Sequence, residues 1–333
     1  MTDNLLPGMS FQDHTGRDGI YASCHKKFID HPDSLARINF GSDFLAQTNV
    51  WPVDRYATRF YQPSDIDQDL AMTLFGEVLD ESNGTGLGAK GGSKRTNPKF
   101  MDPIRIKDVL TLGVPTDADK PLVDLFNDQI VTLRQVVEEL PDYKKRVQWT
   151  KHRMGAIDPS IISVNLPYKY MQPPKPAASA KLQKCMSDKD IGDSKPDQIL
   201  LTSTYEPDRM GDFDQSLKLQ GAQLTQQPIY DQDSELVPPC KAPFVFRKGA
   251  LIAVEAQLSV FHFVNDPKDP NHLFQLSASR VKILAPSPLA YQELKPFHPL
   301  PQRKVLPSRS SMIDTMMLKT SGKATGSNMD LNT

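Results

Sequence analysis

The sequence predicts an α+β fold built around an antiparallel sheet or a β-barrel, with a few helices and long irregular loops. Two long segments in which apolar and polar residues alternate, between Pro243 and Leu284, predict a β-hairpin. Two other segments carry apolar residues at helical spacing. The 28 prolines in 333 residues exceed the usual share of about 5%. They predict long loops between the regular elements and beyond them.

The predicted hairpin has a clear period of two in its first strand. Apolar residues occupy every second position from Ile252 to Val260, with Glu255 and Gln257 between them. The connection that follows, NDPKDPNH, holds two prolines and several turn residues, so neither strand continues through it. In the second strand the apolar residues change from one face of the strand to the other near Ser279 and Arg280. This change predicts a β-bulge at that point.

A short apolar run from Phe244 to Phe246, read as a strand, and a glycine corner at Gly249 precede the hairpin. The resulting order, FVFRKGALIAVEAQLSVFHF followed by LFQLSASRVKIL, resembles the closing strands of the OB-fold, a small barrel used by proteins that bind single-stranded nucleic acid. The resemblance covers residues 243–285. It implies an OB-like β-barrel and a single-stranded nucleic acid as the ligand.

Two helices are predicted ahead of the hairpin. The first follows a capping pattern formed by Ser64 and Asp67, and it ends at the Ser82-Asn83-Gly84 turn. Its apolar stripe consists of Ile66, Leu70, Leu74 and Val78. The second helix begins after Asp117 or Asp119 and ends before Pro141. We also expect strands from Ile104 to Val114 and in the segment ISVNLPYKY.

Composition along the chain predicts one folded domain with flexible ends and one insertion. We expect a flexible N-terminus over residues 1–19 and an α+β region over residues 20–166. Residues 167–197 are rich in Pro, Ser, Lys and Asp, which predicts a disordered linker or insertion. Residues 198–285 form a β-rich region that packs with the first, and residues 286–333 form a disordered tail.

The net charge and the cysteines indicate which compartment and which classes of partner to expect. The formal net charge is −1, so any binding to nucleic acid must rest on local basic patches. The three cysteines, Cys24, Cys185 and Cys240, are far apart and include no CxxC pair, which fits a reducing compartment. No leader pattern and no long apolar segment are found. We therefore expect a soluble intracellular protein, in the nucleus or the cytoplasm, with no membrane partner.

The glycine-rich stretch from Gly86 to Gly91 matches the pattern GxGxxG without the context of a dinucleotide site. Such a site needs a strand before the glycines and a helix after them, whereas here a helix is predicted before and Pro98 follows. A Walker A loop would need a lysine where Gly92 stands. We expect a mobile loop. Its alternative role is to follow a phosphate backbone with its glycine amides and with Lys90, Lys94 and Arg95.

No catalytic or metal-binding pattern is complete. Cys24, His25 and His31 lie close together, but no fourth ligand follows at a defined spacing. No GxSxG or HExxH motif is present. We therefore expect a protein that is not an enzyme and that uses no cofactor and no metal.

The segment DYKKRVQWTKHRM is the best candidate for a binding patch, because it combines cations with aromatic residues. Cations contact phosphates and aromatic rings stack on bases, which together give binding that tolerates any sequence. The alternative is a surface helix with solvated cations. Phe261 and Phe263 add two rings to the otherwise polar face of the hairpin. The predicted contact residues of the patch are Tyr143, Lys144, Lys145, Arg146, Trp149, Lys151 and Arg153.

These patterns favour a binding protein without catalytic activity, whose ligand is single-stranded DNA or RNA. The alternative is a structural or coat-like protein that assembles with copies of itself, since a β-core with Pro-rich ends also fits that class. A homo-oligomer is compatible with both.

Overall fold

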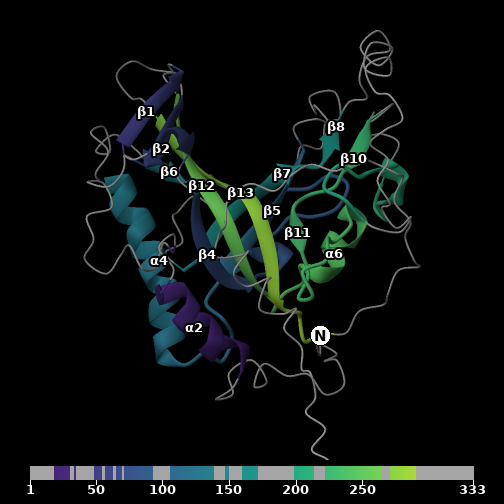
Figure 1. Ribbon diagram of the computed structural model, residues 1–333, viewed down its shortest axis with the longest axis horizontal. Coiled ribbons are helices and arrows are strands. Elements are labelled where there is room, and N and C mark those ends of the chain that lie inside the picture. Colours follow the sequence, from purple (N-terminus) through teal and green to yellow (C-terminus); the bar gives the residue numbers. More distant parts are fainter. Residues whose placement is uncertain are drawn as a thin grey trace, which may run out of the picture.

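The computed structural model describes residues 19–30, 34, 49–54, 57–62, 65–69, 71–92, 106–138, 147–149, 160–171, 199–213, 222–263 and 271–289. Five strands in this part of the chain close into a β-barrel (Figure 1). The strands run in the order β12-β4-β5-β7-β13, and β13 pairs again with β12. They are β4 (Ala71–Val78), β5 (Lys107–Gly113), β7 (Ile162–Tyr168), β12 (Leu251–Phe263) and β13 (Asn271–Ala285).

The barrel is mixed. β7 and β13 run parallel, while the other neighbouring pairs are antiparallel. When the five barrel strands are numbered by their order in the sequence, their order around the barrel is first, second, third, fifth, fourth and back to the first. The predicted α+β fold with a β-barrel is confirmed, and the barrel is compatible with an OB-like fold.

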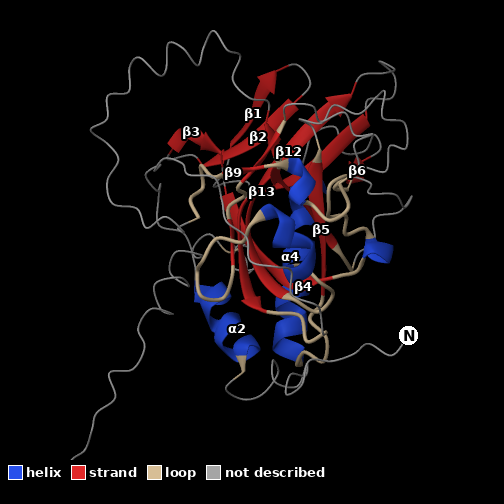
Figure 2. Cartoon of the chain, turned by 90° about the vertical axis from the view of Figure 1, so that its right-hand side faces the viewer, coloured by secondary structure: helices blue, strands red, loops and turns tan. Residues whose placement is uncertain are grey.

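Short strands lengthen the hairpin at one end of the barrel. β2 pairs with β12 at Ser259–Phe261, and β6 runs parallel to β13 at His272–Phe274. β1, β2 and β6 lie together at the upper left of Figure 1, and β1, β2 and β3 lie at the upper end of the strands in Figure 2. The bounds are β1 (Asn49–Asp54), β2 (Ala57–Gln62), β3 (Asp65–Asp69) and β6 (Val147–Trp149).

A small three-stranded sheet lies on the other side of the barrel, at the upper right of Figure 1. Its strands are β8 (Tyr170–Met171), β10 (Gln223–Thr225) and β9 (Thr204–Tyr205). A second apolar core forms under it, with Tyr170, Tyr205 and Leu224 fully or almost fully buried. β11 (Ile229–Tyr230) runs parallel to β13 near this sheet. The chain thus passes directly from the barrel strand β7 into this small sheet.

Two helices, α2 (Ile20–Asp30) and α4 (Lys120–Glu138), cover β4. The rings of Phe28 from α2 and Phe126 from α4 pack on Phe75, with centroids 4.8 and 6.4 Å away. Gln129 of α4 also makes the two hydrogen bonds to the Phe75 backbone that a neighbouring strand would otherwise make. Its Nε2 donates to the Phe75 carbonyl at 3.0 Å, and its Oε1 accepts from the Phe75 amide at 2.8 Å. The helix therefore closes the barrel where β4 and β5 separate.

The predicted hairpin, the bulge and the second helix are confirmed. β12 and β13 pair in an antiparallel ladder from Leu251 to Phe263. The register passes from Glu255 opposite Arg280 to Ala256 opposite Ala278, so Ser279 is the additional residue of the bulge. Strands β5 and β7 also lie where they were expected.

The helix predicted from Ser64 is wrong, because this segment forms β3 and β4. Every residue of β4 from Met72 to Val78 is buried, since one face lines the barrel and α2 and α4 pack on the other. A strand buried on both faces shows no period of two, and its apolar residues happened to fall at helical spacing. At Gly76 a Cβ would come within 2.9 Å of Leu112 and Phe126.

The strand predicted from Phe244 to Phe246 is wrong too. The short helix α6 (Ala242–Val245) occupies this place, with Pro243 in its first turn. Gly249 does form the expected corner, with a φ of 90°. At the start of the predicted linker, Pro167 and Tyr168 belong to β7 and Tyr170 and Met171 form β8, while residues 172–198 lie outside the described part.

Among the helices that the structure describes, none combines the length and the apolar character needed to cross a lipid bilayer.

Candidate nucleic-acid interface

An exposed ring and a cation lie side by side on the second and third strands of the barrel. Lys107 of β5 and Tyr168 of β7 are register partners. The Lys107 Nζ lies 4.3 Å from the centroid of the Tyr168 ring, and Tyr168 is 51% exposed. The Tyr168 carbonyl accepts a hydrogen bond of 3.1 Å from the Thr225 hydroxyl, which fixes the backbone at this strand end. This pair is the exposed surface of the candidate interface.

The residues that follow this pair in the sequence, Asp108 of β5 and Lys169 between β7 and β8, form a buried ion pair. The Lys169 Nζ lies 2.5 Å from Oδ1 of Asp108, and their side chains are only 1% and 3% exposed. Burial raises the pKa of Asp108, which the charge of Lys169 opposes and the charge of Asp212 reinforces. The outer pair, Lys107 and Tyr168, therefore rests on an inner pair at the adjacent positions.

The glycine-rich loop, residues 86–92, lies along β5 on the side away from β7. The amide of Gly86 donates to the Val109 carbonyl and the Val109 amide donates to the Gly86 carbonyl, both at 2.9 Å. The Gly92 amide donates to the Lys107 carbonyl, also at 2.9 Å. Lys90 is exposed at the turn of the loop. The loop thus brings Lys90 next to the strand that carries Lys107.

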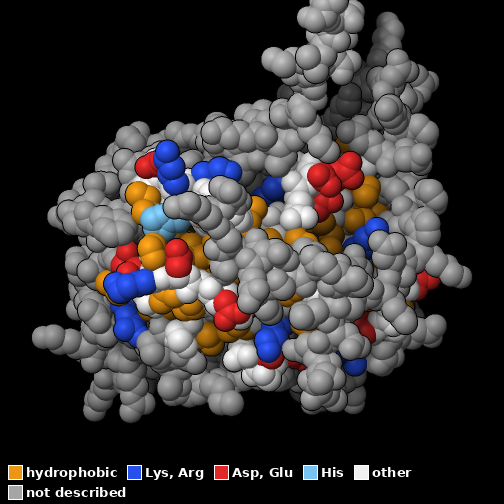
Figure 3. All heavy atoms as spheres, turned by 90° about the horizontal axis from the view of Figure 1, so that it is seen from below, with side chains coloured by type: hydrophobic (Ala, Val, Ile, Leu, Met, Phe, Trp, Pro, Cys, Tyr) orange, Lys and Arg blue, Asp and Glu red, His pale blue; other side chains and the backbone are white. Residues whose placement is uncertain are grey.

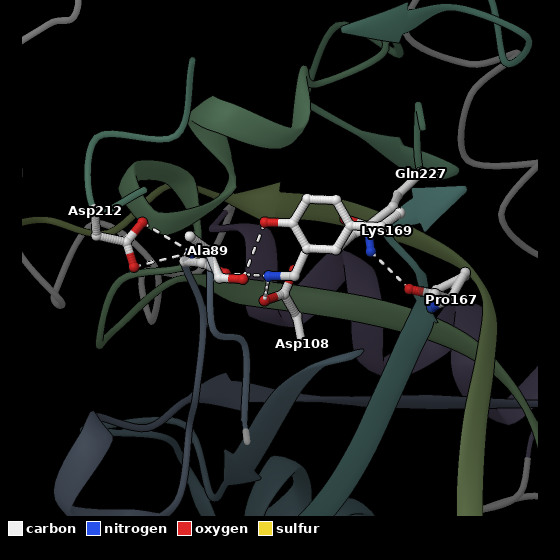
Figure 4. A network of polar contacts seen from close by, with 8 residues as sticks. Ala89, Asp108, Pro167, Lys169, Asp212 and Gln227 are labelled. Atoms are coloured by element: carbon white, nitrogen blue, oxygen red, sulfur yellow. Dashed lines mark hydrogen bonds and ion pairs between the residues drawn. The ribbon is translucent and has the colours of Figure 1, made fainter. Parts of the chain in front are cut away.

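Two buried side chains, Lys169 and Tyr170, and the exposed Asp212 hold the turn of this loop in place (Figure 4). The Lys169 Nζ donates to the Gly88 carbonyl, and the Tyr170 hydroxyl donates to the Ala89 carbonyl at 3.0 Å. The Ala89 amide donates to the Asp212 carboxylate at 2.8 and 2.9 Å. Gly88 has a φ of 94°, and a Cβ there would lie 2.4 Å from Oδ2 of Asp212. Asp212 and Asp108 lie on either side of Ala89 in Figure 4.

These bonds correct the expectation that glycine amides would follow a phosphate backbone. The amides of Gly86, Ala89, Gly91 and Gly92 already donate to acceptors of the protein itself. A carboxylate, Asp212, takes the place that an anion would need at Ala89. A phosphate at this loop would therefore meet side chains, of which the structure describes Lys90, rather than these amides.

The aromatic positions predicted at the hairpin come together at one end of the sheet. Trp149 of β6 is in register with Phe274 of β13, and Phe274 is in register with Val260 of β12. Phe261 is in register with Leu273, one row further along. Successive rows belong to opposite faces of a sheet. The pairing therefore places the Trp149 position close to Phe261 and Phe263 along the strands. Its row belongs to the opposite face of the sheet from the rows of Phe261 and Phe263.

The other predicted contact residues lie outside the described part of the chain: Tyr143, Lys144, Lys145, Arg146, Lys151, Arg153, Lys94 and Arg95. Sequence reasoning missed Lys107, Tyr168 and the buried pair beneath them. The signal was present only as two dipeptides, Lys107-Asp108 at the start of one expected strand and Tyr168-Lys169 at the end of another. Alternation predicts that one member of each is buried, but not which positions meet.

Among the other titratable groups of the described chain, Cys24 belongs to the apolar core. Cys24 lies buried in α2, and burial raises the pKa of its thiol to about 11. No cluster of three or more His, Cys, Asp or Glu side chains suited to a metal occurs among the described residues.

On the face that Figure 3 shows, described side chains of both charges are interspersed. This face therefore offers no patch of a single charge among the described residues.

No protein-family model, no curated protein and no solved structure matches this chain. The structure itself gives a closed barrel that is compatible with an OB-like fold, the Lys107–Tyr168 pair on two of its strands, and an exposed Lys90 in the loop beside β5.

Proposed function

We propose that this protein binds single-stranded nucleic acid, without catalysis, on the surface formed by Lys90, Lys107 and Tyr168. The observation that carries the proposal is the half-exposed Tyr168 ring beside the Lys107 ammonium, on adjacent strands of a closed barrel. A ring supplies a surface on which a base stacks, and a cation supplies a contact for the phosphate next to it.

The place of this pair in the barrel supports the same conclusion. OB-folds bind oligonucleotides on the face of their second and third strands and with the loop that joins the first and second strands. Here β5 and β7 are the second and third barrel strands, and they carry Lys107 and Tyr168. The loop with Lys90 lies in the connection between β4 and β5. Lys94 and Arg95 belong to the same connection and add to its positive charge.

The magnitudes fit a moderate affinity that tolerates any sequence. Stacking of one base on an aromatic ring contributes about 1–3 kcal/mol. The formal net charge of the chain is −1, so attraction to phosphates depends on local cations. We therefore propose binding that weakens as the salt concentration rises.

The end of the hairpin is the second contact region that we propose. Trp149 in β6 and Phe261 and Phe263 in β12 are brought to one end of the sheet, and the cations of residues 143–153 flank β6 in the chain. Because the Trp149 position and the Phe261 position belong to rows of opposite parity, we do not place their rings on one platform. A single-stranded nucleic acid that reaches this region would contact the two faces of the hairpin separately.

The test is binding of labelled oligo-dT and oligo-rU, followed by fluorescence anisotropy at several salt concentrations. We expect Tyr168→Ala and Lys107→Gln to weaken binding, and Lys120→Gln, an exposed lysine on α4, to leave it unchanged. Equal affinity of the wild type and Tyr168→Ala would remove the basis for this site. Large regular particles in light scattering without nucleic acid, together with no oligonucleotide binding, would favour the coat-like alternative instead.

A further inference from the structure

The inner pair beneath the interface, Lys169 and Asp108, brings an amine and a carboxyl group into direct contact away from water. Its N···O distance of 2.5 Å is shorter than the 2.7–2.9 Å that is usual for a charged N–H···O hydrogen bond. The two side chains are 1% and 3% exposed, so water is nearly excluded. We propose that Lys169 and Asp108 form an intramolecular isopeptide bond, an amide between Nζ of Lys169 and Cγ of Asp108.

Burial gives a reason for such a bond. Two opposite charges taken out of water lose hydration, and their attraction repays this loss only when the geometry and the remaining hydrogen bonds are very good. The Lys169 Nζ contacts Oδ1 of Asp108 and the Gly88 carbonyl, so both of its described partners are buried with it. An amide carries no charge, so its formation removes both charges from the interior while it keeps the two strands joined.

The surroundings of the pair favour the uncharged form of the Asp108 carboxyl group, which the reaction needs. Burial raises the pKa of Asp108, and the nearby charge of Asp212 raises it further, against the influence of Lys169. The Gly88 carbonyl accepts from the Lys169 Nζ and so orients the amine. Tyr170 borders the site, with its ring centroid 5.9 Å from the same Nζ.

The reaction balances without an oxidant or a further reactant. Transfer of a proton from the Lys169 ammonium to the Asp108 carboxylate gives an amine and a carboxylic acid. The amine lone pair attacks Cγ, the Nζ–Cγ bond forms and the bond from Cγ to its hydroxyl oxygen breaks. One water molecule leaves, made of that hydroxyl group and one proton of the amine. Because the site excludes water, hydrolysis of the amide is disfavoured.

The bond would join β5 to the residue between β7 and β8. It would link the barrel to the small sheet and hold the strand ends that carry Lys107 and Tyr168. The partners are 61 residues apart in the sequence, so the cross-link would close a long loop. Closing a long loop reduces the entropy of the unfolded chain.

The experiment is the intact mass of the full-length chain, measured under denaturing conditions. We expect a mass lower than that of the sequence by one water molecule, and a digest that contains a branched peptide with both Lys169 and Asp108. Asp108→Asn provides a second measurement, because condensation with an amide side chain releases ammonia instead of water. In Asp108→Ala, digested whether or not it folds, we expect no branched peptide.

A wild-type mass equal to that of the sequence, without a branched peptide, would overturn the proposal. A deficit of one water molecule whose peptide maps to other residues would do so as well. Neither result depends on oligonucleotide binding, so the proposed function and the isopeptide bond can fail separately.

Discussion

The ammonium group of Lys107 lies 4.3 Å from the ring centroid of Tyr168, on the outer surface of two paired barrel strands. This contact gives the exposed tyrosine ring a fixed neighbour of opposite electrostatic character. One side of the ring faces a cation, which holds the ring and adds a contribution of about 0.5–1 kcal/mol at exposed sites. The surface is rigid because the backbone of β7 is fixed by Thr225 at Tyr168 and by Gln227, whose Nε2 donates to the Pro167 carbonyl at 2.8 Å.

Tyr168→Ala is expected to weaken oligonucleotide binding by about 1–3 kcal/mol, because one stacked base is lost. Tyr168→Phe keeps the ring and should retain most of the affinity. The free energy of unfolding should change little in both variants, since the side chain is 51% exposed. Anisotropy titration and urea unfolding measure the two effects. A loss of binding in Tyr168→Phe that equals the loss in Tyr168→Ala would argue against stacking.

Lys107→Gln and Lys90→Gln should each flatten the dependence of affinity on salt. For single strands, each phosphate contact contributes a slope of about 0.7 in a plot of log affinity against log salt. We expect each variant to lower the slope by roughly that amount, with little dependence on oligonucleotide sequence. Lys120→Gln on α4 is the matched control. Slopes that are identical in all four proteins would exclude contacts from these two lysines.

The elements whose signal lies within one segment were predictable. The hairpin, the bulge at Ser279 and helix α4 follow from alternation, from a parity change and from helical spacing. β4 was not predictable in this way, because both of its faces are buried and α4 supplies Gln129 in place of a strand. Burial by partners that are distant in the sequence leaves no local period.

The candidate site was predicted in part. Lys90 in the glycine-rich loop is exposed beside the interface, although the loop amides are used within the protein. The pairs Lys107–Tyr168 and Asp108–Lys169 depend on the register between β5 and β7. A shift of one residue would exchange their faces, and no feature of either segment alone determines that register.

Gly88→Ala should destabilise the glycine-rich loop. Its φ of 94° is unfavourable for any residue with a Cβ, which costs about 1–2 kcal/mol, and the new methyl group would displace the Asp212 carboxylate. Gly211→Ala is the matched control, because no atom lies within 4 Å of a Cβ at that position. Urea unfolding measures both. Equal midpoints for the two variants would mean that Asp212 does not hold this turn.

Gln129→Met should destabilise the barrel, because it leaves the amide and the carbonyl of Phe75 without their partner. Each unsatisfied buried backbone group costs about 1–3 kcal/mol. Asn127→Ala, at an exposed position of the same helix, should change the free energy of unfolding by less than about 0.5 kcal/mol. If Gln129→Met were as stable as Asn127→Ala, the proposed closure of the barrel by α4 would be wrong.

Stability should fall as the pH rises from 9 to 11, and Cys24 should account for part of the fall. Burial raises the pKa of this thiol from 9.0 to about 11. Over this interval the unfolded chain loses a proton that the folded protein keeps, so unfolding becomes more favourable with rising pH. A shift of two pKa units corresponds to about 3 kcal/mol at full effect. Urea unfolding at several pH values should therefore show a steeper decline for the wild type than for Cys24→Ala. Native Cys24 should also react with iodoacetamide more slowly at pH 9 than it does in the denatured chain. Parallel declines in the two proteins, or equal alkylation rates, would show that the Cys24 thiol ionises in the folded state as readily as in water.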